Sequence, residues 1–126
     1  MKIGFLTVPL NGLDILEIIQ WAAESGFEAI EVAVWPVENE RDFSATTVNV
    51  DEIRGSDIEE IRETLTKYGI LISSLAYYDN NLDANLEKRK KINDHLIKVI
   101  DLAHNLGVEL VGTFIGRDIT KTVEEN

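Results

Sequence analysis

The sequence predicts an α/β fold in which parallel β-strands alternate with helices, and three observations support this fold class. A glycine ends an amphipathic stretch at three places, Gly26, Gly69 and Gly107. Glycine is the usual residue just past a helix C-terminus, because it takes the left-handed conformation without a Cβ clash. Each glycine is also followed by a short apolar run of strand length. Helix and strand in this alternation are typical of a parallel sheet with right-handed crossovers.

The elements are expected in the order strand, helix, strand, helix, strand, helix, strand. The apolar run from Ile3 to Val8 is the first strand, and each later strand follows one of the glycines. Ser56, with Glu59 three residues later, predicts a capping box at the start of the second helix. Each helix has an apolar stripe of helical period. The three stripes are Ile15, Ile18, Ile19 and Ala22; Ile58, Ile61, Leu65 and Tyr68; and Ile92, Leu96, Val99, Ala103 and Leu106.

The spacing of the glycines predicts how much of a fold is present. They lie 43 and 38 residues apart, so one βα unit takes about 40 residues. A (β/α)8 barrel needs eight units, usually ~250 residues. The 126 residues hold about four strands and three complete helices. We therefore expect residues 1–126 to be a single domain, the N-terminal half of a TIM (β/α)8 barrel. The end of the chain predicts truncation, because the helix cap at Asp118 is followed by too few residues for a buried helix.

The two faces of the second strand favour a barrel over an open sheet. Along residues 29–35, Ile30, Val32 and Val34 share one face, whereas Glu31 lies on the other. Helices cover both faces of a doubly wound sheet, where an unpaired buried carboxylate is costly. A barrel interior accepts Glu31 if the carboxylate is hydrogen-bonded or faces the mouth of a site.

Composition limits the classes of partner. Twelve basic and 23 acidic residues give a net charge of −11, which disfavours nucleic acid. The basic run 88–91 lies among acids on a helix and is expected to be a solvated face. The chain has no cysteine and no apolar run approaching ~20 residues. Its first residues do not resemble a signal peptide. We expect a cytoplasmic protein that contacts no membrane.

Candidate binding residues follow the ends of the predicted strands, where parallel barrels collect their reactive groups. Trp35, Tyr77, Tyr78 and Phe114 either wall a polyol or ring substrate or plug the barrel top. Arg117 either presents a cation to an anionic substrate or pairs with Asp118 or Glu31.

Thr7 and Thr113 either bind substrate hydroxyls or fill a layer of the barrel. Glu31 is a weak candidate for a general base, and a structural hydrogen-bonding role is the alternative. We thus predict Trp35, Tyr77, Thr113, Phe114 and Arg117 as substrate-binding residues and assign no firm catalytic residue.

A metal site is not predicted within the chain. The only histidines, His95 and His104, lie nine residues apart on one helix, about 180° from each other. Both are expected to be semi-buried helix residues away from the strand ends. The single glycine after the first strand, Gly12, is not a phosphate loop, and no Gly-x-Ser-x-Gly elbow occurs.

Three segments resemble the sugar phosphate isomerase/epimerase family, the xylose isomerase-like barrels that are also related to endonuclease IV. They are Met1–Phe5, Gly26–Val32 and Ala103–Val111. The resemblance implies isomerisation or epimerisation of keto-sugars by proton transfer beside a divalent metal, Mn, Co, Mg or Zn. It places the usual ligands, Glu, Asp, His and Glu, in the second half of the barrel, so no residue of this chain is assigned as a ligand. Endonuclease-type members have histidines after the third and fourth strands, where this chain has Tyr77-Tyr78 and Phe114.

We therefore expect the N-terminal part of a sugar isomerase or epimerase barrel that is inactive by itself. Its exposed strand edges predict a homodimer or a complementing half-barrel, with a small sugar as substrate of the full barrel. The alternative is a non-catalytic half-barrel scaffold or a designed folding module that self-associates.

Overall fold

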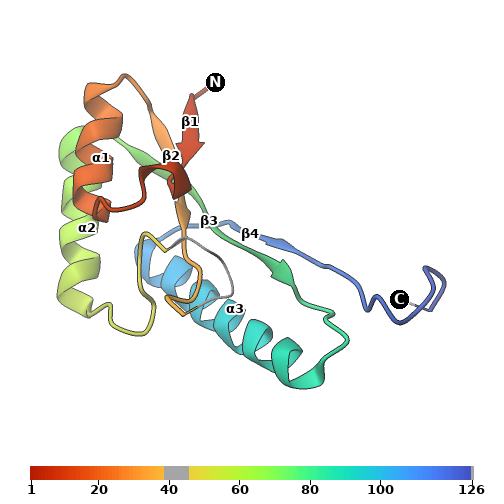
Figure 1. The fold of residues 1–126 in the computed structure, drawn as a ribbon. Coiled ribbons are helices and arrows are strands. Elements are labelled where there is room, and N and C mark those ends of the chain that lie inside the picture. Colours follow the sequence, from red (N-terminus) through yellow and green to blue (C-terminus); the bar gives the residue numbers. More distant parts are fainter. Residues whose placement is uncertain (39–45, 126) are drawn as a thin grey trace.

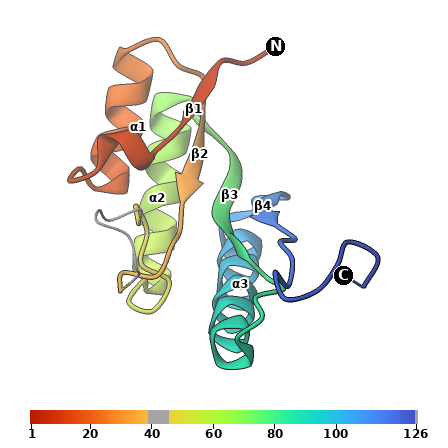
Figure 2. The same ribbon diagram turned by 45° about the vertical axis from the view of Figure 1, so that its right-hand side comes forward.

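A four-stranded parallel sheet with strand order β1-β2-β3-β4 forms the centre of the computed structural model, which describes residues 1–38 and 46–125 (Figure 1). The predicted alternation of strand and helix is confirmed. The helices α1 and α2 lie beside the first two strands, and α3 lies below β3 and β4 (Figures 1 and 2). The elements are β1 (Gly4–Leu6), the 3-10 helix η1 (Val8–Leu10), α1 (Ile15–Glu24), β2 (Ala29–Ala33), α2 (Gly55–Tyr68), β3 (Leu71–Asn80), α3 (Leu86–Leu106) and β4 (Val111–Phe114).

This arrangement is the first half of a TIM barrel, as the glycine spacing predicted. Gly69 and Gly107 end α2 and α3 in the left-handed conformation, with φ of 67° and 72°. Their N–H groups bond back to the last turn of each helix, which satisfies carbonyls that would otherwise lack partners.

The pairing of β2 with β3 contains one register shift. This shift determines which β3 residues lie on the open face of the sheet, opposite the helices. Ile30 pairs with Ile72, but Glu31 pairs with Ser74, so Ser73 is an extra residue on β3. A one-residue shift exchanges the two faces of a strand beyond it. Ser74, Ala76 and Tyr78 therefore share a face with Glu31, whereas Leu75 and Tyr77 face the helices.

The apolar core lies between the sheet and the helices. All four predicted stripe residues of α1 are buried, and α3 buries Ile92, Val99, Ala103 and Leu106 as predicted. They pack with the fully buried strand residues Ile30, Val32 and Leu75. In α2 only Ile61 is fully buried, and the other stripe residues are half-buried at the edge of the core.

The predicted capping box at Ser56 and Glu59 is wrong by two residues. The N-cap of α2 is Arg54, whose backbone N–H donates to the Asp57 carboxylate at 2.8 Å. Ser56 lies inside the first turn, because the helix starts at Gly55. A capping box does open α1, where Asp14 and Glu17 each accept a hydrogen bond from the other's backbone N–H.

Beyond β4 the chain extends away from the sheet (Figure 1). The Asp118 carboxylate accepts a hydrogen bond from the Thr120 backbone N–H at 2.9 Å, as a cap would, but residues 119–125 form turns rather than a helix. Among the described residues no helix is long and apolar enough to cross a membrane.

Candidate functional site

The sheet face opposite the helices carries a hydrogen-bonded carboxylate. Glu31 lies in the middle of β2, and its Oε1 accepts hydrogen bonds from Ser74 Oγ at 3.0 Å and Tyr78 Oη at 2.6 Å. Both donors come from β3, four residues apart, which places them on one face of that strand. Glu31 is half-buried. The barrel interpretation required a hydrogen-bonded carboxylate on this face, and the structure has one.

The phenol of Tyr78 stays protonated throughout the neutral range. Its hydrogen bond to Glu31, followed by burial and by the charge of that carboxylate, raises the pKa of Tyr78 to about 12. At neutral pH Tyr78 therefore acts toward Glu31 as a fixed hydrogen-bond donor.

Gly112 on β4 leaves the space that Tyr78 fills. A Cβ at position 112 would lie 2.5 Å from Tyr78 Oη and 3.0 Å from Cζ, so any larger residue would displace the phenol. Gly112 pairs with Ala76 across the sheet. The Tyr78 phenol thus lies directly against the backbone at Gly112.

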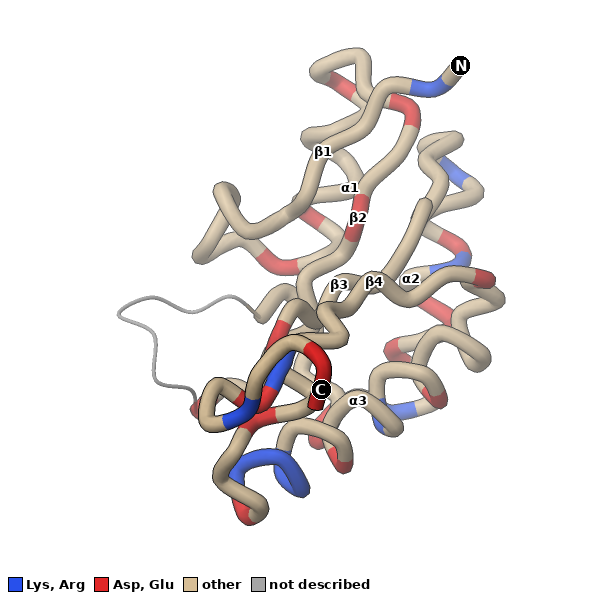
Figure 3. The backbone as a smooth tube through the Cα atoms, turned by 90° about the vertical axis from the view of Figure 1, so that its right-hand side faces the viewer, with Lys and Arg blue, Asp and Glu red and all other residues tan. Residues whose placement is uncertain are grey.

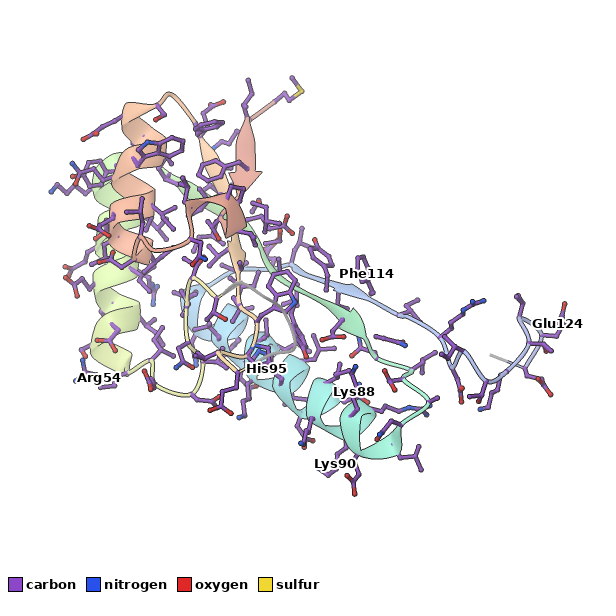
Figure 4. The ribbon with its side chains drawn as sticks, viewed as in Figure 1. Arg54, Lys88, Lys90, His95, Phe114 and Glu124 are labelled. Atoms are coloured by element: carbon purple, nitrogen blue, oxygen red, sulfur yellow. The ribbon has the colours of Figure 1, made fainter. Side chains whose placement is uncertain are left out.

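Aromatic residues from three strands meet around Tyr78. Its ring centroid lies 5.9 Å from that of Trp35, which follows β2, and 5.0 Å from that of Phe114 at the end of β4. Trp35 is 4% exposed and Phe114 is 58% exposed. Figure 4 shows Phe114 on the side of β4 away from α3. Tyr78 thus lies between a buried ring, Trp35, and an exposed ring, Phe114.

Tyr77 does not lie at the open rim, where the sequence placed it. Its side chain is 1% exposed, and its ring packs on His95 of α3 with centroids 4.6 Å apart. Successive residues of a strand point to opposite faces, so Tyr77 and Tyr78 cannot both face a substrate.

Thr113 within β4 and Arg117 beyond it are both exposed, and two asparagines hold them. Asn81 Nδ2 donates to Thr113 Oγ1 at 3.0 Å. Asn80 Nδ2 donates to the Arg117 carbonyl, and Asn80 Oδ1 accepts from the Arg117 backbone N–H, both at 2.9 Å. Neither asparagine was predicted as a binding or positioning residue, although both lie directly after a predicted strand, which was the available signal.

The suggested pairing of Arg117 with Asp118 is not what the structure has. The Asp118 carboxylate lies 3.8 Å from Arg89 Nη2 and 3.7 Å from Lys121 Nζ. Hydrogen bonds from Thr120, followed by these two cations, hold the pKa of Asp118 below its usual value. Thr7, the other threonine considered, is buried, and its Oγ1 accepts from the Ala33 N–H, so it connects β1 to β2.

The two histidines differ from the expectation that both are semi-buried away from the strand ends. His104 is exposed, but His95 is 6% exposed and its Nε2 lies 2.8 Å from the Val34 carbonyl oxygen, just past β2. Figure 4 shows His95 on α3 beneath the strands. A carbonyl oxygen only accepts, so Nε2 carries the proton.

The described part of the chain does not fit a divalent metal. Within residues 1–38 and 46–125, no three His, Cys, Asp or Glu side chains come close enough together to hold an ion. Acidic residues are spread over the helices and loops (Figure 3). Several are engaged by cations of the basic run on α3, including Asp94 with Lys90.

Residues 19–126 match the family model described as xylose isomerase-like TIM barrel. The 3-keto-D-glucoside 4-epimerase YcjR from E. coli superposes with a TM-score of 0.60 at 18% identity, covering 88% of this chain and 36% of that protein. An uncharacterised protein from Parabacteroides distasonis superposes with a TM-score of 0.58, also at 18% identity, covering 89% and 42%. This chain thus spans less than half of either protein. A comparison with curated protein sequences found no match.

Proposed function

The chain belongs to the xylose isomerase-like TIM barrel family, and on that premise we propose that it forms the substrate-binding N-terminal part of a barrel that isomerises or epimerises keto-sugars. The whole barrel's reaction would be proton transfer at a carbon next to a carbonyl group. The similarity to a 3-keto-glucoside epimerase supports the choice of keto-sugars.

The open face of the sheet carries this proposal. It combines a fixed carboxylate, Glu31, with the aromatic side chains of Tyr78 and Phe114. Sugar pockets need this combination, because sugar rings have both hydroxyl groups and faces of C–H bonds. In a closed barrel this face is the interior, and the rim after β2, β3 and β4 surrounds the mouth of the site.

The metal expected for the family is not assigned to this chain. Among the described residues, no three His, Cys, Asp or Glu side chains lie close enough together to hold it. We assign binding and orientation of the sugar to this part of the barrel. Thr113, Phe114 and Arg117 remain proposed as substrate-binding residues, and Tyr78 replaces the buried Tyr77. Trp35 is buried as well, so its proposed role is to support the Tyr78 ring.

The chain by itself is proposed to lack turnover and to need a second half-barrel. Its open face leaves a charged carboxylate and an exposed Phe114 without a facing wall. A second copy, or strands that follow in the encoded protein, would close the barrel. A non-catalytic scaffold that self-associates is the alternative, and it predicts closure without sugar binding.

The test is solvent exchange in D2O, using the protein as encoded, with any residues that follow Asn126. Keto-sugars are incubated with the protein and Mn²⁺ or Co²⁺, and proton NMR follows the hydrogen next to the carbonyl. We expect deuterium to replace that hydrogen in at least one keto-sugar and the metal-free protein to be slower. Binding without exchange would leave only a sugar-binding protein, and neither binding nor exchange would favour the scaffold.

A further inference from the structure

We propose that Glu31 is a positioning residue, which holds the ring of Tyr78 over Gly112 so that Tyr78 contacts the C–H face of the sugar. This inference rests on the proposed function for its ligand, but its geometry stands on this chain alone. It is the alternative to the weak assignment of Glu31 as a general base, and the two roles predict different variant behaviour.

The first argument is the crowding of a single carboxylate oxygen. Oε1 of Glu31 accepts from both Ser74 Oγ and Tyr78 Oη, at 3.0 and 2.6 Å. Two donors from one strand fix the carboxylate in position and occupy the oxygen that they share. A general base instead needs an oxygen within hydrogen-bond reach of the substrate proton. The contacts of Glu31 lead to Tyr78.

The second argument is the confinement of the Tyr78 ring. Glu31 holds its hydroxyl, Trp35 and Phe114 lie beside the ring, and Gly112 leaves room beneath it. Tyr78 still remains half-buried rather than buried. An aromatic ring that is both fixed in orientation and partly accessible can receive a ligand without losing side-chain entropy on binding.

The third argument is the chemistry of the accessible surface. A fixed phenol ring next to the exposed ring of Phe114 presents apolar area at the rim. The C–H face of a sugar ring buries apolar surface against such a ring, while its hydroxyl groups remain at the edge for polar partners. Thr113 within β4 and Arg117 in the loop that follows it are both exposed and lie beside Phe114 in the chain.

Two Glu31 variants separate positioning from base catalysis. Glu31→Gln keeps an oxygen that accepts the Tyr78 hydrogen bond but cannot take a proton. We expect this variant to bind sugar and to exchange deuterium within about threefold of the wild type, because it loses one charge but keeps the hydrogen bond. A general base would instead lose about 10²–10⁴-fold in exchange. Glu31→Ala releases the ring and should weaken sugar binding about tenfold. Glu109→Ala, an exposed acid before β4, is the control.

Variants of Gly112 and Tyr78 test the space that the ring fills and the ring itself. Gly112→Ala should displace the phenol and weaken sugar binding about as much as Glu31→Ala does. Tyr78→Phe keeps the ring but removes the hydroxyl that bonds to Glu31, and Tyr78→Ala removes the ring itself. Circular dichroism of each variant shows whether the fold is retained. If Glu31→Ala does not fold, Gly112→Ala carries the comparison.

A second measurement reports the hydrogen bond without any sugar. In protein with ¹³Cζ-labelled tyrosine, Tyr78 should titrate at about 12 in the wild type and nearer the ordinary tyrosine pKa of 10.0 in Glu31→Gln. A purely space-filling Glu31 would leave this titration unchanged. A normal Tyr78 titration in the wild type would overturn the positioning role.

The outcomes distinguish this inference from the proposed function. If the wild type binds no sugar but Tyr78 has the raised pKa, the proposed function and the sugar contact are overturned, while the hydrogen bond by which Glu31 positions Tyr78 is confirmed. If the variants Gly112→Ala, Glu31→Ala and Tyr78→Ala all bind sugar as tightly as the wild type, this inference is overturned and the proposed function is left intact.

Discussion

Replacing His95 with Phe should destabilise the fold far more than the same change at His104. Both residues lie on α3, nine positions apart. His95 is buried and its Nε2 donates to the Val34 carbonyl at 2.8 Å, whereas His104 is exposed. Phe keeps an aromatic ring against Tyr77 but has no donor, so the Val34 carbonyl loses a buried hydrogen bond.

The structure sets the expected magnitude. A buried acceptor that loses its donor costs about 1–3 kcal/mol in the free energy of unfolding, whereas an exposed substitution usually stays within ~0.5 kcal/mol. We therefore expect His95→Phe to lose about 2 kcal/mol more than His104→Phe. His95→Gln, whose amide can donate, should recover part of the loss.

Urea unfolding followed by circular dichroism at 222 nm measures the difference. An unchanged slope with a lower midpoint would identify a stability loss rather than a change in the unfolded state. Nitrogen-15 NMR of the histidine ring should also show a slowly exchanging Nε2–H in the wild type. If His95→Phe unfolds at the same urea concentration as His104→Phe, the hydrogen bond to Val34 contributes nothing and the reasoning is wrong.

Three further predictions concern packing, pH and assembly. Val99→Ala, at a fully buried position of α3, should lose about 2 kcal/mol in urea unfolding, whereas Ile97→Ala, at an exposed position on the same helix, should stay close to the wild type. Because the pKa of Asp118 is lowered in the folded state, its contribution should be present above the ordinary value of 3.8 and lost as the pH falls through the folded value. Asp118→Asn should therefore flatten acid unfolding below that pH, and identical acid curves would contradict the assignment. Light scattering should find a dimer, since β1 and β4 both present unpaired edges, and a monodisperse monomer would contradict closure between copies.

Local signals explain what the sequence predicted well. The left-handed glycines after α2 and α3 and the buried stripe of α1 depend on residues within a few positions of each other. Glu31 was predicted on the barrel interior from alternation alone, and it lies there, hydrogen-bonded. The start of α2 was misplaced because two acidic residues, Asp57 and Glu59, each suit a capping box, and only the backbone conformation chooses between them.

Alternation along a strand shows that Tyr77 and Tyr78 cannot share a face, but no local pattern shows which of them lies on the open face. The extra residue Ser73 shifts the pairing of β3 with β2, which turns Tyr77 to the helices and Tyr78 to the open face. Without that shift the two tyrosines would exchange faces.

By itself, the sequence determined the order of the elements, because helix periodicity, caps and alternation act over short separations. Only the tertiary structure decided which groups meet. Glu31 reaches Ser74 and Tyr78 across 43 and 47 residues of chain, and His95 reaches Val34 across 61. Such contacts depend on strand register and helix docking, which are set when the sheet assembles.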